Sequence, residues 1–273
     1  MNRRNFLKTS AVAATGYSLT PLMGKSYSSV LGQTAPGNKI KIGLIGCRNQ
    51  GWTNLKAFLE YPETECVSLC DIDDQWLYQR AKKKKKMTGK KPPQLVKDWR
   101  RVIDNKDVDM VIIGTPDHWH CLQLVAACEA GKDVYVEKPL ANTIAECDIM
   151  VKAARKYDRI VQVGQWQRSD PHWDEAAAYV QSGALGRVRN VKVWAYQTSK
   201  YTLPVVPNSA PPKGVDYDMW LGPAPKRDYN DNRFHYNFRF FWDYAGGLMA
   251  DWGVHLLDYA MKGMNVGLPS YVY

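Results

Sequence analysis

KIKIGLIGCRNQG, residues 39–51, is the stretch that decides the fold. Its apolar run at residues 40–45 predicts a short buried strand, and a helical pattern follows at residues 53–61. A strand, a glycine turn and a helix are how a dinucleotide-binding βαβ unit begins, because the helix N-terminus must meet a pyrophosphate. Gly46 and Gly51 occupy the first and last glycine positions of G-x-G-x-x-G, but Arg48 stands at the middle one. A plain structural turn therefore remains an alternative to a cofactor site.

Length and composition indicate a globular protein with one large or two ordinary domains. The chain has 273 residues, of which 45% are hydrophobic, and a net charge of +10. A lysine run at residues 82–86 could bind nucleic acid, but no aromatic residue interleaves with it, which favours a solvated surface. We therefore expect no nucleic-acid partner. The six cysteines form no C-x-x-C pair, so we expect free thiols rather than a zinc or redox motif.

Residues 1–36 indicate a targeting segment and a linker. Arg3 and Arg4 precede Asn-Phe-Leu-Lys, and the mildly apolar residues 11–23 are too few and too polar to span a bilayer. This segment resembles a twin-arginine export signal, and a disordered basic tail is the alternative. The resemblance predicts a periplasmic or otherwise exported protein that uses the twin-arginine machinery, a route that carries folded proteins with their cofactors already bound.

Residues 37–165 alternate apolar strands with helical patterns. We expect strands at 40–45, 65–70, 110–113, 133–136 and 160–163, and helices at 53–61, 76–87, near 98–104, at 122–130 and at 143–157. This alternation predicts an α/β protein with a Rossmann-like parallel sheet, whose ligands lie outside the carboxyl ends of the strands. Asp71 falls there, twenty residues after Gly51, where a carboxylate binds the adenosine ribose and favours NAD over NADP. A helix N-cap is the alternative role for Asp71.

Residues 166–273 are expected to form a second, substrate-binding domain. The alternation at residues 188–196 predicts a strand, and residues 269–273 resemble the start of another, so we expect an α+β domain whose open sheet is C-terminally incomplete. A helix is expected at residues 248–262, with Asp251, His255 and Asp258 on one face. This spacing suits a metal, but the sequence offers no obvious third ligand, and we expect no metal site.

Together these motifs resemble the Gfo/Idh/MocA family, which includes glucose–fructose oxidoreductase and inositol dehydrogenase. The resemblance covers residues 38–273 and is carried by the glycine turn, Asp71, TPDHWH at 115–120, EKP at 137–139 and GGxxxDxGxHxxD at 246–258. It implies an NAD-dependent oxidoreductase for a small sugar or polyol, and a homo-oligomer in its full-length form. The cofactor contacts that we expect are Gly46, Arg48, Gly51, Asp71, Thr115, Pro116, His120, Glu137 and Lys138.

The resemblance also implies a catalytic set of Lys138, Asp251 and His255. Oxidation of a secondary alcohol needs a base, and either Lys138 or His255 could take the hydroxyl proton. A cationic Lys138 would stabilise a developing alkoxide, and Asp251 would orient its neighbours. His255 could instead be an ordinary helix histidine. We also expect substrate contacts from Arg168, His235 and Arg239, with surface ion pairs as the alternative.

Three classes of function remain open at this point. The leading prediction is an exported NAD-dependent sugar or polyol dehydrogenase. The second is a glycoside hydrolase that oxidises its sugar transiently with NAD, and the third is a non-catalytic nucleotide- or sugar-binding protein. The motifs serve the first two equally well, so the sequence does not separate them.

Overall fold

The computed structural model describes residues 39–195, 203–267 and 269–272, which belong to one compact unit. The expected targeting segment, residues 1–36, lies outside the described residues. Six strands form one parallel sheet: β1 Ile40–Ile45, β2 Thr64–Cys70, β3 Gln94–Val96, β4 Met110–Ile113, β5 Asp133–Val136 and β6 Val161–Val163. Their spatial order is β3-β2-β1-β4-β5-β6, the order of a dinucleotide-binding fold. The predicted α/β class with a Rossmann-like sheet is confirmed.

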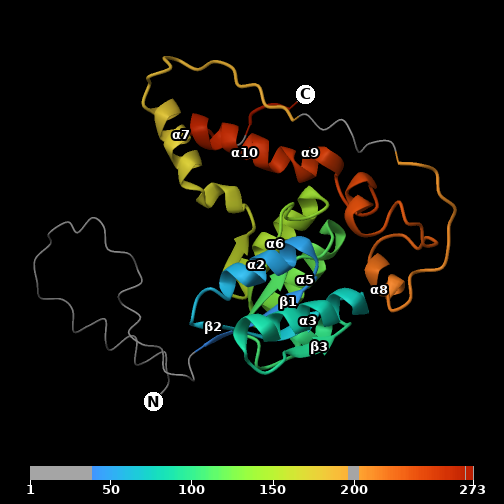
Figure 1. Cartoon of the computed structure of the whole chain (residues 1–273). Coiled ribbons are helices and arrows are strands. Elements are labelled where there is room, and N and C mark those ends of the chain that lie inside the picture. The colour runs from blue at the N-terminus through green and yellow to red at the C-terminus, as the bar shows by residue number, and fades with distance from the viewer. Residues whose placement is uncertain (1–38, 196–202, 268, 273) are drawn as a thin grey trace, which may run out of the picture. The chain divides into compact units, whose positions relative to one another are not determined.

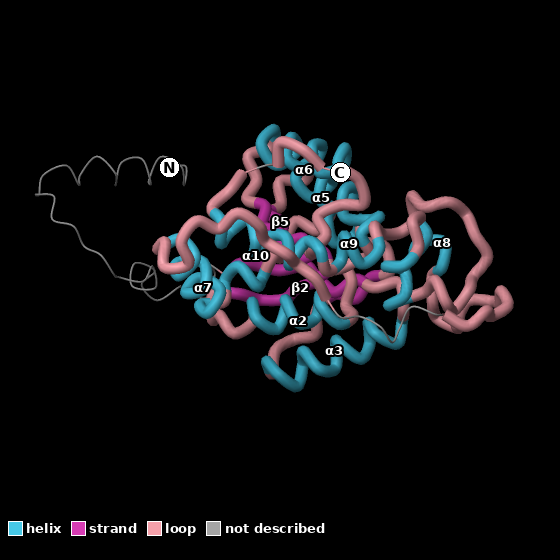
Figure 2. The backbone as a smooth tube through the Cα atoms, turned by 90° about the horizontal axis from the view of Figure 1, so that it is seen from above, coloured by secondary structure: helices cyan, strands magenta, loops and turns pink. Residues whose placement is uncertain are grey.

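Helices cover both faces of this sheet. They are α2 Asn49–Phe58, α3 Asp74–Thr88, α4 Arg100–Ile103, α5 Asp117–Glu129 and α6 Ile144–Lys156. Figure 2 shows α2 and α3 on one side of the strands and α5 and α6 on the other. Leu55 and Leu77 pack with β1 and β2 in one buried cluster, and Leu124 and Met150 pack with β4 and β5 in the other. The two clusters hold the carboxyl ends of the strands in fixed positions.

The differences from the sequence prediction include two helix starts that bear on the site and one strand that was not predicted. Helix α2 begins at Asn49, four residues before position 53, so its N-terminus lies directly after Arg48. Helix α5 begins at Asp117 rather than at residue 122, so His118 and His120 are helical. Pro116, at the N-cap, has no backbone N–H to contribute and suits a helix start. Strand β3 has only three residues and no alternating pattern, which is why the sequence did not indicate it.

Beyond the sheet the described chain is helical or irregular. Its elements are the short 3₁₀ segments η2 Trp166–Ser169 and η3 His235–Phe240 and the helices α7 Pro171–Gln181, α8 Tyr217–Leu221, α9 Gly247–Asp251 and α10 Gly253–Met264. Helices α7 and α10 lie side by side (Figure 1). Trp173 of α7 stacks on Tyr259 of α10 with ring centroids 3.7 Å apart. None of the helices in the described part of the chain is long and apolar enough to cross a membrane.

Three predictions for this second part are wrong. Residues 188–195 form no strand, although position 196 lies outside the described residues, because no described segment offers them a neighbouring strand to pair with. Residues 269–272 likewise form no strand. The expected single helix at 248–262 is instead two helices, α9 and α10, separated at Trp252. Asp251 and His255 therefore belong to different helices.

Candidate active site

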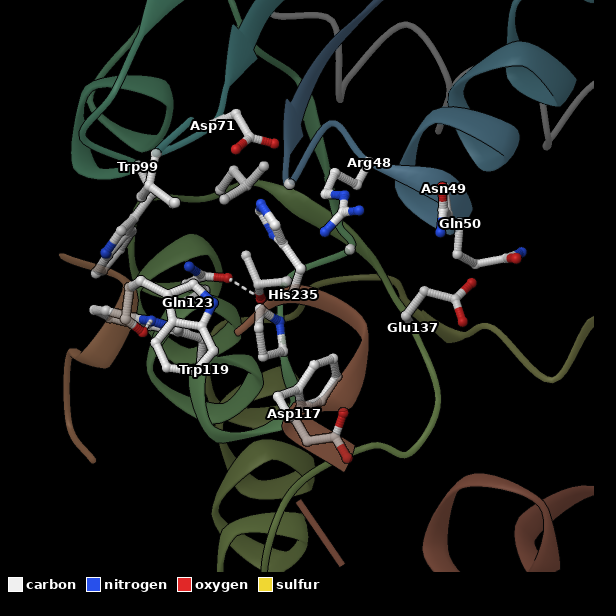
Figure 3. A pocket seen from close by; sticks show the side chains of 18 of the residues that line it. Arg48, Asn49, Gln50, Asp71, Trp99, Asp117, Trp119, Gln123, Glu137 and His235 are labelled. Atoms are coloured by element: carbon white, nitrogen blue, oxygen red, sulfur yellow. Dashed lines mark hydrogen bonds between the residues drawn. The ribbon is translucent and has the colours of Figure 1, made fainter. Parts of the chain in front are cut away.

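A cavity of about 200 Å³ lies at the carboxyl ends of the strands (Figure 3). Its walls come from the turn after β1, the end of β2, the start of α5, the segment after β5, and residues 219–239. Of the predicted site residues it is lined by Gly46, Arg48, Asp71, Thr115, Pro116, Glu137, Lys138, His235 and Arg239. Most of the predicted cofactor contacts are thus brought together at one place.

The glycine turn forms a close-fitting cradle. Gly46 has φ +89°, and a Cβ there would lie 2.6 Å from the carbonyl oxygen of Gly114. A Cβ on Gly51 would overlap the carbonyl oxygen of Gly46. Helix α2 has no side-chain N-cap and no acid in its first turn, so its positive end is open to an anion. These features fit the pyrophosphate of a dinucleotide.

Asp71 directly follows β2 and is buried. Its Oδ2 accepts from the Cys47 backbone N–H at 2.7 Å, and its Oδ1 accepts from that of Asp73 at 3.0 Å. Each oxygen keeps a second lone pair for a ribose hydroxyl. Burial raises the pKa of Asp71 to about 6, although both backbone hydrogen bonds oppose this shift. Asp73, rather than Asp71, caps helix α3, so the alternative role of Asp71 as a helix N-cap is not what the structure shows.

Arg48 reaches into the cavity from the glycine turn (Figure 3). Its guanidinium lies 4.9 Å from the ring centroid of Trp76, and its buried Nε has no hydrogen-bond partner among the described residues. Burial lowers the pKa of Arg48, and the charges of Asp71 and Asp73 partly restore it. The side chain therefore points away from the middle of the turn, and its Nε–H is a donor that a phosphate can accept.

Glu137 and Lys138 follow β5 and face different neighbours. Glu137 accepts a hydrogen bond from Asn54 Nδ2 of α2 at 2.7 Å, and burial raises its pKa. A Cβ on Gly164 would lie 2.7 Å from Glu137 Oε1, so a glycine is needed beside this carboxylate. Glu137 thereby joins α2 to the segment that carries Lys138.

Lys138 lies in a cluster of charges with Asp251 and Arg239. Its Nζ donates to Asp251 Oδ1 at 2.7 Å and to the Asp251 backbone carbonyl at 2.9 Å. Arg239 Nε lies 3.3 Å from the other carboxylate oxygen, Oδ2. Burial raises the pKa of Asp251, but the hydrogen bond from Lys138 and the charge of Arg239 outweigh this, so the net shift is downward. Asp251 is therefore an ionised bridge between two cations.

Five predicted site residues do not line the cavity: Gly51, His120, Arg168, Asp251 and His255. His255 is buried against Trp166, and its side chain has no hydrogen bond among the described residues. Burial, and next the charge of Lys138, lower its pKa, so the imidazole is neutral at pH 7. Arg168 forms a bidentate ion pair with Asp258, with distances of 2.6 and 2.5 Å. Its role as a substrate contact stays a prediction.

The two histidines of the TPDHWH motif, His118 and His120, bond backbone carbonyls beside the cavity and do not line it themselves. His120 is fully buried, and its ring nitrogens lie 2.9 Å from the carbonyl oxygens of Thr115 and Pro139. It therefore connects the two loops that line the cavity without lining it. His118 Nε2 lies 3.1 Å from the Trp220 carbonyl oxygen, and burial lowers its pKa to about 4. His120 therefore bonds two loops, whereas His118 bonds helix α8.

Sequence reasoning missed Asp117, Gln123 and Asn54. Asp117 lines the cavity at the start of α5, and burial raises its pKa to about 7. Gln123 accepts from the Thr115 hydroxyl at 2.8 Å, a contact dashed in Figure 3. Asp117 belongs to a motif that the sequence singles out, so its position at a strand end was a usable signal. The other two lie within helices and gave none. No group of three potential metal ligands occurs among the residues that the structure describes.

Comparisons with known proteins agree with this geometry. Residues 40–165 match the family described as "Oxidoreductase family, NAD-binding Rossmann fold", and residues 177–263 match its "C-terminal alpha/beta domain". A "Glycosyl hydrolase family 109 protein" of Shewanella pealeana is 30% identical over 170 residues, 57% of this chain and 37% of the relative. Another, from Solibacter usitatus, is 31% identical over 163 residues, 58% of this chain and 37% of the relative.

Solved structures show the same fold. An NAD-binding protein from Listeria innocua superposes with a TM-score of 0.55 at 20% identity, covering 82% of this chain and 54% of that one. The chain therefore spans about half of that structure and less than half of the curated relatives it matches. With both domains of one family matched in order around the cavity, the chain belongs to the Gfo/Idh/MocA family of NAD-binding oxidoreductases.

Proposed function

We propose that the chain is an NAD-dependent oxidoreductase that acts on a secondary alcohol of a small sugar or polyol. The observation that carries this proposal is that one cavity joins an anion cradle and a ribose-binding carboxylate to Lys138, whose ammonium is paired with Asp251. The first two features suit a dinucleotide, and the third suits an alcohol that loses a proton. When bound, NAD would supply the hydride acceptor.

The chain's own residues have distinct parts in this proposal. Gly46, Gly51 and the N-terminus of α2 bind the pyrophosphate, with Arg48 as a cationic partner. Lys138 orients the substrate hydroxyl and stabilises negative charge on its oxygen. Asp251 holds the lysine ammonium in place through its carboxylate and its backbone carbonyl. His255, neutral and close enough for Lys138 to affect its pKa, is the candidate proton acceptor once a substrate opens a path to it.

A Lys138→Met variant tests the chemistry separately from cofactor binding. We expect turnover on any active sugar to fall by about 10²–10⁴-fold, the usual loss when a positioned acid–base or electrostatic group is removed. NAD affinity, measured by calorimetry, should change little, because the cradle remains. The matched control is Lys132→Met, a buried lysine that bonds backbone carbonyls away from the cavity. Undiminished turnover in Lys138→Met would contradict the proposal.

NAD rather than NADP is the cofactor that we propose. The Asp71 carboxylate, at a pH above its pKa of about 6, repels a 2′-phosphate and attracts ribose hydroxyls. An Asp71→Asn variant should lose affinity for NAD while gaining relative affinity for NADP. Tighter binding of NADP than of NAD by the unmodified chain would refute this choice.

A glycoside hydrolase that uses NAD transiently is the second candidate. The glycosyl hydrolase names of the curated relatives favour it, as does Asp117, a cavity carboxyl whose pKa of about 7 suits proton donation to a leaving group. An aryl glycoside separates the two candidates. Release of the aryl group with no net NADH favours the hydrolase, whereas net NADH from a free sugar favours the dehydrogenase.

Export by the twin-arginine route remains a proposal that rests on residues 3–8. Fractionation of cells that produce the chain, compared with an Arg3→Lys, Arg4→Lys double variant, provides the test. The proposal requires the chain in the periplasm and the double variant in the cytoplasm. The same distribution for both would exclude a function for the two arginines.

A further inference from the structure

His235 lies at the end of the cavity that holds Asp71, which we call the adenosine end, rather than at the catalytic end, which holds Lys138. Its Nε2 is 3.2 Å from Asp73 Oδ2, and the backbone N–H of Asp73 donates to the ribose-binding carboxylate of Asp71. The charges that shift the pKa of His235 are those of Asp73, Arg48 and Asp231, and none belongs to the Lys138 cluster. In Figure 3 its ring extends toward the same part of the cavity as Arg48.

Contacts on both sides fix the position of this histidine. Val215 forms a bridge with Asp73, and the backbone N–H of Asp216 donates to the Ile72 carbonyl at 2.9 Å. These bonds attach the segment before α8 to the end of β2. Phe234 packs in the aromatic cluster with Trp220 and lies 3.8 Å, centroid to centroid, from the His235 ring. The imidazole is therefore positioned before any ligand arrives.

The Asp73 contact also determines which ring nitrogen is an acceptor. A carboxylate only accepts hydrogen bonds, so Nε2 must carry the hydrogen. Burial lowers the pKa of His235, the hydrogen bond to Asp73 opposes this, and the charge of Arg48 adds to the lowering. The ring is thus neutral at pH 7, and Nδ1 is an acceptor without a partner among the described residues. Asp71 and His235 consequently present two acceptors and no donor.

We propose that His235 is a cofactor-binding residue whose Nδ1 accepts a hydrogen bond from an adenosine ribose hydroxyl and disfavours a nucleotide that carries a 2′-phosphate. A ribose offers two hydroxyl donors, one for Asp71 and one for His235 Nδ1. A 2′-phosphate replaces one donor with acceptor oxygens and negative charge, so the Asp71 carboxylate would repel it and His235 Nδ1 would lose its donor. The inference rests on the nucleotide site proposed above and assigns to that site a residue from outside the Rossmann sheet.

Calorimetric titration of the full chain with NAD, NADP, ADP-ribose and nicotinamide mononucleotide tests the proposal. His235→Asn suits the backbone, since His235 has φ +52°, a region that asparagine tolerates, but it is too short to bond both Asp73 and the ribose. His235→Ala is the second variant. Loss of one hydrogen bond predicts about two- to tenfold weaker binding of NAD and ADP-ribose. Binding of nicotinamide mononucleotide should not change, and the NADP-to-NAD affinity ratio should rise.

The exposed His172→Ala serves as the control and should bind all four nucleotides like the unmodified chain. Unchanged binding of NAD and ADP-ribose by both His235 variants would overturn the inference while leaving the proposed function intact. Equal weakening of all four nucleotides would also overturn it, because the effect would then not be local to adenosine. If the unmodified chain bound none of them, the proposed function would fail and this inference with it.

Discussion

Replacement of Asp117 by asparagine should stabilise the protein at neutral pH, although it removes a residue of the cavity. Asp117 is only 5% exposed, and burial raises its pKa from 3.8 to about 7. The folded state then holds a proton that the unfolded state releases, so stability falls as pH rises from about 4 to about 7. Each pKa unit corresponds to about 1.4 kcal/mol, and the whole difference to about 4 kcal/mol as an upper bound.

Asparagine resembles the neutral acid and does not titrate, so the variant should lack this penalty. The favourable interaction of the carboxylate with the N-terminus of α5 offsets about 0.3–1 kcal/mol of the gain. Between pH 5 and pH 8, the stability of Asp117→Asn relative to the unmodified chain should rise by roughly 2–3 kcal/mol.

Urea unfolding of both proteins without nucleotide, at half-unit pH intervals, measures this difference. The titration of Asp71 is common to both proteins and cancels in the comparison. Asp174→Asn, an exposed aspartate in the first turn of α7, is the control and should run parallel to the unmodified chain. Parallel curves for Asp117→Asn as well would refute the reasoning, because they would show that Asp117 is ionised in the folded state at pH 5.

Three further predictions concern the nucleotide cradle and its support. Gly51→Ala should weaken NAD binding at least tenfold in a calorimetric titration, because its Cβ would overlap the Gly46 carbonyl and displace the N-terminus of α2; retained affinity would mean that the turn can relax. Arg48→Ala should weaken NAD binding by about ten- to a hundredfold at low salt and less at high salt, because a charge-assisted hydrogen bond to phosphate is worth about 1.5–3 kcal/mol; tighter binding would show instead that the arginine crowds the pyrophosphate. Gly164→Ala should lower the free energy of unfolding by about 1–3 kcal/mol through displacement of Glu137, and a thermal melt unchanged from that of Gly267→Ala, where a Cβ would meet no neighbour, would contradict this.

The sheet was predictable because its signals are local. Strand β4 is a continuous apolar run, and β1 is apolar except at Lys41; a strand buried on both faces needs little else to be identified. Their connection through helices then determines the parallel order and brings the strand ends together. The position of Asp71 followed from that edge and from its spacing after Gly51, whereas Lys138 was predicted from the family resemblance. The sequence did not predict strand β3, because its three residues pair with β2 but are too few to show a periodic apolar pattern.

The part of the site outside the sheet was less predictable, because long-range contacts decide it. The break at Trp252 places Asp251 and His255 in different helices, and nothing in the helical spacing of residues 248–262 indicated it. Arg239 and His235 were predicted together as substrate contacts, yet one pairs with Asp251 and the other with Asp73. They are four positions apart in the sequence, and only the path of η3 places them at different ends of the cavity.

One segment of the chain, residues 214–244, contributes side chains to both ends of the cavity. Residues 214–216 are bonded to the end of β2, and the carbonyl of Tyr244 accepts from the backbone N–H of His118 in α5. Between these anchors, Tyr217, Trp220, Phe234 and Tyr244 pack in one aromatic cluster. His235 and Arg239 follow Phe234 in η3 and both line the cavity. The segment that bonds to the end of β2 therefore also carries the side chain that pairs with Asp251.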